Sequence, residues 1–174
     1  LSSNEVIDGQ LQLASGSSTA SLTAAAGASN NIELQLGIAS LGDWLPDAGG
    51  RLDGHFAILG KMPNLSINGQ LHVHSLAWQQ QKADTLQLIV GLPDLSRLAG
   101  KLDLQPSNEY LQGLTFQHIN LLAEGSQGDH RLNVDARGTQ LSGTLAVHGA
   151  LKGSAWNGTL ATLDLEPQGM PGWR

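Results

Sequence analysis

The chain has 174 residues, with 9 lysine and arginine residues against 15 aspartate and glutamate residues, giving a formal net charge of −6. The basic residues are scattered singly, which excludes the clustered basic surface of nucleic-acid-binding proteins and disfavours adsorption to an anionic membrane. Cysteine is absent, so disulfides, thiolate catalysis and cysteine-based zinc sites are excluded, and only 4% of residues are aromatic, fewer than closed cores usually use.

The chain has the character of a segment taken from a longer protein. It begins at Leu1 without a methionine and ends at Arg174 inside patterned sequence. Its longest uncharged stretch, Gly9–Ile32, is rich in Ser, Thr and Gln, which does not suit a membrane span. We therefore expect residues 1–174 to be a single segment of a more extended structure.

Apolar and polar residues alternate with a period of two along most of the chain. Because successive side chains of a strand point to opposite faces, each alternating run has one apolar and one polar face. No long stretch has helical spacing, so the sequence predicts an all-β fold. In chain order the runs are Ile32–Ile38, Leu52–Ile58, Leu65–Val73, Leu86–Val90, Leu102–Leu104, Leu132–Ala136 and Leu141–Val147.

Short interruptions separate these runs. Ser40–Leu45 and Asp94–Ala99 each lie beside a proline and are the best candidates for short helices. Glycines such as Gly9 and Gly54 follow an aspartate and could mark hairpin turns. Because they keep the parity of their apolar neighbours, we place them inside strands on the apolar face. Turns are expected instead at Gly27–Asn31, Gly60–Asn64, Gln79–Lys82, Glu124–Asp129 and Gly149–Ser154.

The sequence repeats itself. Residues 45–76 and 134–165 align without a gap, sharing apolar and glycine positions, and we interpret them as an internal repeat. A shorter unit, apolar-x-Gly-x-apolar-x-apolar, recurs at Ile7–Leu13, Leu52–Ile58, Ile67–Val73, Leu98–Leu104, Leu141–Val147 and, ending in threonine, Trp156–Thr162.

Catalytic and metal-binding motifs are weak or missing, and we predict neither an enzyme nor a cofactor. His72 and His74 have the spacing of a two-histidine metal site, but the sequence assigns no third ligand, so we interpret them as exposed residues of a polar row. We interpret His118, His130 and His148 as surface residues as well. There is no nucleophile elbow, phosphate loop or dinucleotide motif.

The apolar face is the remaining candidate for function. Alternating strands most often pack as a β-sandwich, whereas an open face would form a groove for acyl chains. The residues alone leave both alternatives open. We expect this face to contain Leu34, Leu36, Leu52, Phe56, Ile58, Ile67, Leu71, Val73, Leu86, Leu88, Leu102, Leu104, Leu132, Val134, Leu145, Val147, Trp156 and Leu160.

Two stretches resemble the repeat signature of the TamB family. The first runs from Leu45 to Gly60 and continues at Ile67–Leu71; the second runs from Gly138 to Leu163 and ends at Pro171–Trp173. The resemblance covers about Ile32 to Trp173 and rests on recurring glycine and leucine positions. It implies a long sheet, antiparallel or mixed, curled into a taco-like trough with an apolar interior. Near Pro93 and Pro106 the alternation lapses, and an interruption of the trough is expected there.

The resemblance also implies a function. Such AsmA-like proteins are anchored in the inner membrane of Gram-negative bacteria, extend through the periplasm and carry phospholipid acyl chains between the two membranes. TamB proteins are paired with the outer-membrane barrel TamA and support outer-membrane protein biogenesis. An alternative is a chaperone-like module that binds unfolded outer-membrane strands along a sheet edge. Free edges also predict edge-to-edge self-association of the segment.

Overall fold

The computed structural model describes residues 7–26, 29–111 and 113–168. The described residues are all-β apart from two 3-10 turns, η1 (Leu41–Asp43) and η2 (Leu95–Arg97), which occupy the two segments expected to be short helices. The all-β prediction is confirmed. The strands are β1 (Ile7–Ser15), β2 (Ser18–Ala26), β3 (Asn30–Ile38), β4 (Ala48–Lys61), β5 (Asn64–Trp78), β6 (Gln81–Asp94), β7 (Ala99–Leu111), β8 (Leu114–Ser126), β9 (Asp129–Gly138), β10 (Leu141–Lys152) and β11 (Ala155–Pro167).

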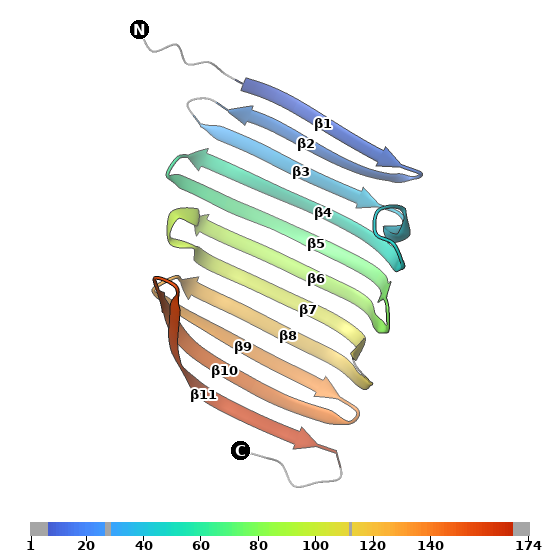
Figure 1. Ribbon diagram of the computed structural model, residues 1–174, viewed down its shortest axis with the longest axis vertical. Coiled ribbons are helices and arrows are strands. Elements are labelled where there is room, and N and C mark those ends of the chain that lie inside the picture. The colour runs from blue at the N-terminus through green and yellow to red at the C-terminus, as the bar shows by residue number, and fades with distance from the viewer. Residues whose placement is uncertain (1–6, 27–28, 112, 169–174) are drawn as a thin grey trace.

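All eleven strands lie in one sheet, in the order of the chain from β1 to β11. Each strand pairs antiparallel with the strand before it, so the sheet is a meander whose first and last strands lie at opposite ends of the long axis (Figure 1). The described residues thus form a single-layered trough and not a sandwich. We call the two sides of the sheet in Figure 1, where the strands turn, the left rim and the right rim.

Glycines lie inside strands, as the parity of the sequence predicts. Gly54 pairs with Leu71, and Gly69 pairs with Phe56. The chain turns at Met62–Pro63, Gln79–Gln80 and Gly153–Ser154, within the segments expected to turn. The expected turn at Gly27–Asn31 begins at positions that lie outside the described residues.

Two strands are not evident from alternation. β2 is built from Ser, Thr and Ala with one leucine, so its apolar face has little hydrophobic contrast. β8 contains consecutive leucines, Leu121 and Leu122, which conceal its period. Strands β6 and β7 also continue through Pro93 and Pro106, and Pro106 pairs with Leu86.

A line of irregular positions crosses four neighbouring strands near the right rim. The β4–β5 register shifts between Gly49 and Arg51, and the β8–β9 register shifts between Phe116 and His118. Across this line the pairs β5–β6, β6–β7 and β7–β8 keep their register, so each of β5 to β8 has one residue more here than β4 and β9. We call these extra residues, Ser75, Asp84, Asn108 and Gln117, the bulge line. Ser75 and Asn108 have positive φ, and bulges of this kind bend strands (Figure 1).

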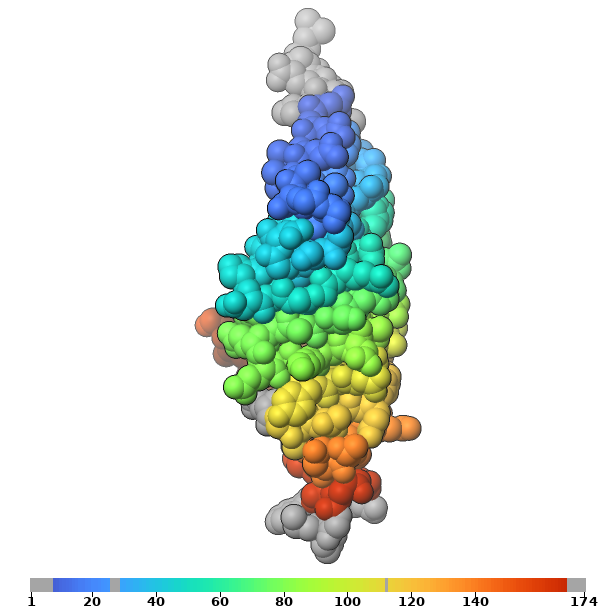
Figure 2. All heavy atoms as spheres, turned by 90° about the vertical axis from the view of Figure 1, so that its right-hand side faces the viewer, coloured from blue at the N-terminus to red at the C-terminus, as the bar shows by residue number. Residues whose placement is uncertain are grey.

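Hydrogen bonds between successive turns hold the rims together. On the left rim the backbone N–H of Gln127 donates to the carbonyl of Arg97, and that of Leu151 donates to the carbonyl of Gln127. On the right rim the N–H of Thr139 donates to the carbonyl of Thr115. Seen toward the right rim, the turns are stacked in chain order along the molecule (Figure 2).

Candidate functional site

Two rows of apolar residues run across the whole sheet on one face. Residues directly opposite in antiparallel strands share a face, so the register fixes the membership of each row. One row comprises Leu11, Leu22, Leu34, Phe56, Gly69, Val90, Leu102, Ala123, Leu132, Val147 and Leu160. The next comprises Leu13, Ala20, Leu36, Gly54, Leu71, Leu88, Leu104, Leu121, Val134, Leu145 and Leu163. The apolar face is therefore continuous from β1 to β11.

The register places all the residues of the predicted apolar face on this one face. Ile58 pairs with Ile67, and Leu52 pairs with Val73, in rows beside the two central ones. Trp156 pairs with Leu151 near the left rim. Val73 is buried and Trp156 and Leu160 are about half exposed, at 51% and 54%, while the other predicted residues are partly buried. In the part of the chain that the structure describes, no second sheet covers this face, so the single layer leaves it accessible.

The opposite face is polar and carries most of the charge. Gln35, His55 and Gln70 pair side by side across β3, β4 and β5. Two ion pairs lie along single strands of this face, Lys101–Asp103 at 3.2 Å and Arg137–Asp135 at 3.5 Å. Water solvates such pairs well, so they add little stability. The contrast between the two faces identifies the apolar one as the candidate binding surface.

The histidines divide between the two faces. His72 pairs with Asp53 and His74 with Arg51, both on the polar face. Within the described ranges, no group of three or more His, Cys, Asp or Glu side chains could hold a metal ion. The prediction that His130 is a surface residue is wrong, because His130 pairs with Gly149 and Gly125 on the apolar face and is half-buried.

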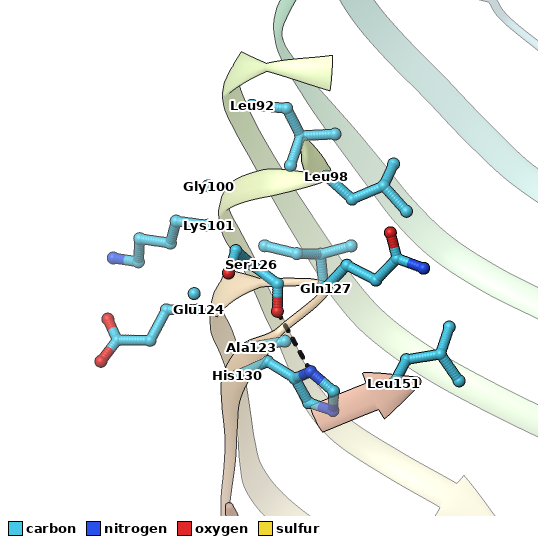
Figure 3. Close-up of a pocket in the computed structure, with 12 residues that line it drawn as sticks. Leu92, Leu98, Gly100, Lys101, Ala123, Glu124, Ser126, Gln127, His130 and Leu151 are labelled. Carbon is cyan, nitrogen blue, oxygen red and sulfur yellow. Dashed lines mark hydrogen bonds between the residues drawn. The ribbon is translucent and has the colours of Figure 1, made fainter. Parts of the chain in front are cut away.

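His130 borders a cavity of about 280 Å³ at the left rim (Figure 3). Leu92 and Leu98 reach it from the two sides of the β6–β7 connection and Leu151 reaches it from the end of β10, and its lining is mainly apolar. The Nδ1 atom of His130 lies 3.2 Å from the carbonyl oxygen of Ser126, which only accepts, so Nδ1 carries the hydrogen. The indole N–H of Trp156 donates to Nε2 of His130 at 2.7 Å. The neutral ring satisfies both hydrogen bonds.

The right rim contains a buried carboxyl group on the apolar face. The strand pairing places this carboxyl group, which belongs to Glu109. Gly138 shares the apolar face with Ala136 and Val134. Phe116 lies opposite Gly138, and Glu109 lies opposite Phe116. Glu109 is 3% exposed, and neither of its carboxylate oxygens has a hydrogen-bond partner among the described residues. Burial raises the pKa of Glu109, and an interaction with its own backbone N–H and the charge of His118 partly oppose that rise. Simple alternation from Ser107 assigns Glu109 to the polar face, and the extra residue Asn108 reverses that assignment.

The sequence profile of TamB, N-terminal domain, matches residues 3–173. The chain belongs to the TamB family. This confirms the resemblance, and the single curled sheet agrees with the trough that the family predicts. No solved structure matches the chain. TamB proteins are bridge-like proteins of the Gram-negative envelope with a general role in lipid and outer-membrane protein assembly, and they work with TamA in a module. No helix in the described part of the chain is long and apolar enough to cross a membrane.

Proposed function

We propose that this segment is a length of periplasmic conduit whose apolar face carries phospholipid acyl chains between the inner and outer membranes. The observation that carries the proposal is the pair of apolar rows, each crossing eleven strands without a charged residue. In this proposal the parent protein is anchored in the inner membrane and works with TamA in outer-membrane protein biogenesis.

The energetics favour acyl chains as the occupant. Each methylene removed from water contributes roughly 0.8 kcal/mol, so contact along a whole chain exceeds thermal energy many times over. The face offers no hydrogen-bonding pattern along its central rows that would select a particular sequence or position. A chain can therefore exchange one set of leucine contacts for the next with little change in free energy.

The neighbouring residues Gln70 and Leu71 provide the test. Leu71 lies on the apolar face opposite Gly54 and Leu88, whereas Gln70 is exposed on the polar face opposite His55. Leu71→Arg in the full-length protein should abolish lipid transfer, because a charge among the leucines costs several kcal/mol when lipid covers it. Gln70→Arg is the matched control and should transfer lipid normally.

Photo-crosslinkers add a direct readout of contact. A crosslinker at Ile58 or Leu71 should capture phospholipid, and one at Ala57 or Gln70 should capture little, since these pairs lie on opposite faces. Equal capture by crosslinkers on the apolar and polar faces would contradict the proposal. Global unfolding of Leu71→Arg, measured by circular dichroism, would also contradict it.

A second candidate is favoured by the outer edges of β1 and β11, each of which pairs with a single strand among the described residues. An unfolded outer-membrane strand could add to either edge through backbone hydrogen bonds. Native mass spectrometry of the protein purified from bacteria separates the two candidates. Bound phospholipid supports the conduit, and bound peptide without lipid supports the chaperone-like module.

A further inference from the structure

The cavity at the left rim lies in a row of the apolar face that is built mainly from glycine. Gly100 pairs with Gly125, Gly125 with His130, and His130 with Gly149. The indole of Trp156 covers Gly149, whereas Gly100 and Gly125 line the cavity. A Cβ at either of these two positions would overlap the backbone of a neighbouring strand. The row therefore has no side chain at Gly100 and Gly125, and this leaves space for the cavity.

The cavity is continuous with the central apolar rows. Leu102 and Ala123, which pair in one of these rows, also line the cavity. Gln127 and Leu151 line it at the rim, where the N–H of Leu151 donates to the carbonyl of Gln127 at 2.8 Å. An apolar cavity of about 150 Å³ holds a benzene ring, so about 280 Å³ has room for several methylenes. The cavity is thus a side branch of the trough that ends at the rim.

The lining of the cavity suits hydrocarbon and not a headgroup. Both ring nitrogens of His130 are already hydrogen-bonded within the chain. The side chains of Lys101 and Glu124 point away from the cavity, and that of Gln127 is exposed at the rim (Figure 3). A charged group in this space would lose its hydration without gaining a partner.

Leu98 is a second sign of an apolar occupant. It ends η2 with a φ of 49°, a left-handed conformation in which glycine or asparagine is favoured. A leucine in this conformation is strained, and its side chain is nevertheless 54% exposed beside the cavity. Hydrocarbon in the cavity would cover Leu98, and the burial would offset the strain.

We propose that this cavity holds the methyl end of one phospholipid acyl chain whose remainder lies on the central rows. The inference rests on the proposed function and adds a fixed stopping place within the conduit. A chain that follows the row through Leu102 and Ala123 bends into the cavity, where its end meets Leu98 and Leu151. The headgroup stays outside, because the lining offers it no partner.

Photoreactive lipids test which end of the chain enters the cavity. The full chain is mixed with vesicles of phosphatidylcholine that carries a diazirine either at the methyl end or beside the carboxyl group of one acyl chain, and the labelled residues are mapped by mass spectrometry. The methyl-end probe should label Leu98 and Leu151 about tenfold more than the carboxyl-end probe, the factor that two methylenes kept out of water give. Equal labelling there by both probes would overturn the inference and leave the conduit standing. Absence of labelling on the whole apolar face would remove both.

Two variants test the cavity itself. Ala123→Phe fills it and should lower methyl-end labelling of Leu151 about tenfold, whereas Ala57→Phe, the same change on the polar face, should not. Leu98→Asn removes the apolar side chain without crowding the cavity. Because asparagine tolerates the left-handed conformation, the melting temperature should stay at or above that of wild type while labelling of Leu151 falls. Wild-type labelling in Leu98→Asn would overturn the inference, whether or not Ala123→Phe folds.

Discussion

The indole of Trp156 on β11 donates a hydrogen bond to His130 on β9, across the intervening strand β10. The same indole covers Gly149 and Gly158, where an added Cβ would overlap the ring. An aromatic side chain laid over glycines in this way shields backbone that they leave open to water. Together these contacts attach the last hairpin to the rest of the sheet.

Trp156→Phe should lower the free energy of unfolding by about 1 kcal/mol, because it removes the hydrogen bond and keeps a ring over the glycines. Trp156→Ala should cost more, about 2 kcal/mol, because the cover is lost as well. Urea unfolding measures both. Trp44→Phe is the control, since the structure gives the described Trp44 side chain no hydrogen bond; an equal loss there would contradict the role given to Trp156.

Gly69 and Gly9 occupy the same position of the seven-residue unit and should respond differently to alanine. A Cβ on Gly69 would overlap the ring of Phe56, whereas a Cβ on Gly9 would meet nothing within 4 Å. Gly69→Ala should destabilise the fold by about 1–3 kcal/mol through overpacking. Gly9→Ala should be neutral or stabilising by up to about 1 kcal/mol. Thermal unfolding of the two variants decides whether the glycine makes room for the ring.

Ser18 is fully buried, and its hydroxyl connects the first hairpin to η1. The oxygen accepts from the backbone N–H groups of Ala39 and Ser40, at 3.1 and 3.3 Å, and the hydroxyl donates to Asp43 at 3.1 Å. Ser18→Ala leaves these groups without their partner and should cost about 1–3 kcal/mol. Hydrogen exchange should accelerate at the amides of Ala39 and Ser40. Unchanged exchange at both amides would show that water replaces the hydroxyl.

Glu109→Gln should change how stability depends on pH. Burial holds the pKa of folded Glu109 above its ordinary value of 4.5, so the folded state binds the proton more tightly than the unfolded state. The resulting stabilisation is complete below the ordinary pKa and is lost as pH rises through the raised one. The difference in melting temperature, Glu109→Gln minus wild type, should therefore increase as pH rises through this window. Above the window the difference should stay constant.

Asp129→Asn provides a comparison of opposite sign. A hydrogen bond and charge from His148, 2.6 Å away, lower the pKa of Asp129, so its contribution is present above the ordinary aspartate pKa and is lost as pH falls through the lowered one. The variant should melt below wild type near neutral pH, by a small margin because the pair is exposed, and approach it in acid. The same pH trend in both variants would contradict the assignment.

The free edge of β1 should drive self-association. Gln10→Lys with Gln12→Lys places two charges on this exposed edge strand, a device that natural sheets use against edge pairing. Sedimentation should show concentration-dependent dimers of wild type that the double variant lacks. Gln35→Lys, exposed on the internal strand β3, should associate like wild type. Equal association of all three proteins would remove β1 as the contact.

The sequence predicts the faces of the central strand regions and fails at their ends. Between turns, alternation alone assigns Leu71 and Gln70 to opposite faces, because a strand has no other way to orient its side chains. The polar side chain of His130 suggests a surface position, but the residue has the same parity as Leu132 and Val134, and this places it on the apolar face.

The bulge line lies beyond what one sequence indicates. An extra residue is defined only against neighbouring strands, and Ser75 is not a residue type that favours positive φ. Asn108 tolerates that conformation, but one asparagine does not reveal that four adjacent strands are lengthened together. The face on which Glu109 lies depends on the extra residue before it in β7. That extra residue is visible in the strand register and not in the sequence.

The order of strands in the sheet makes its length adjustable. Since each strand pairs only with its neighbours in the chain, one more hairpin adds two strand spacings, about 10 Å, and disturbs no existing pair. Ten spacings already give this segment a span of about 48 Å. The two stretches that align in the sequence form β4–β5 and β10–β11, six strands apart. An even separation preserves strand direction, so duplication of whole hairpins is a route by which such a protein could come to match the width of the compartment that it crosses.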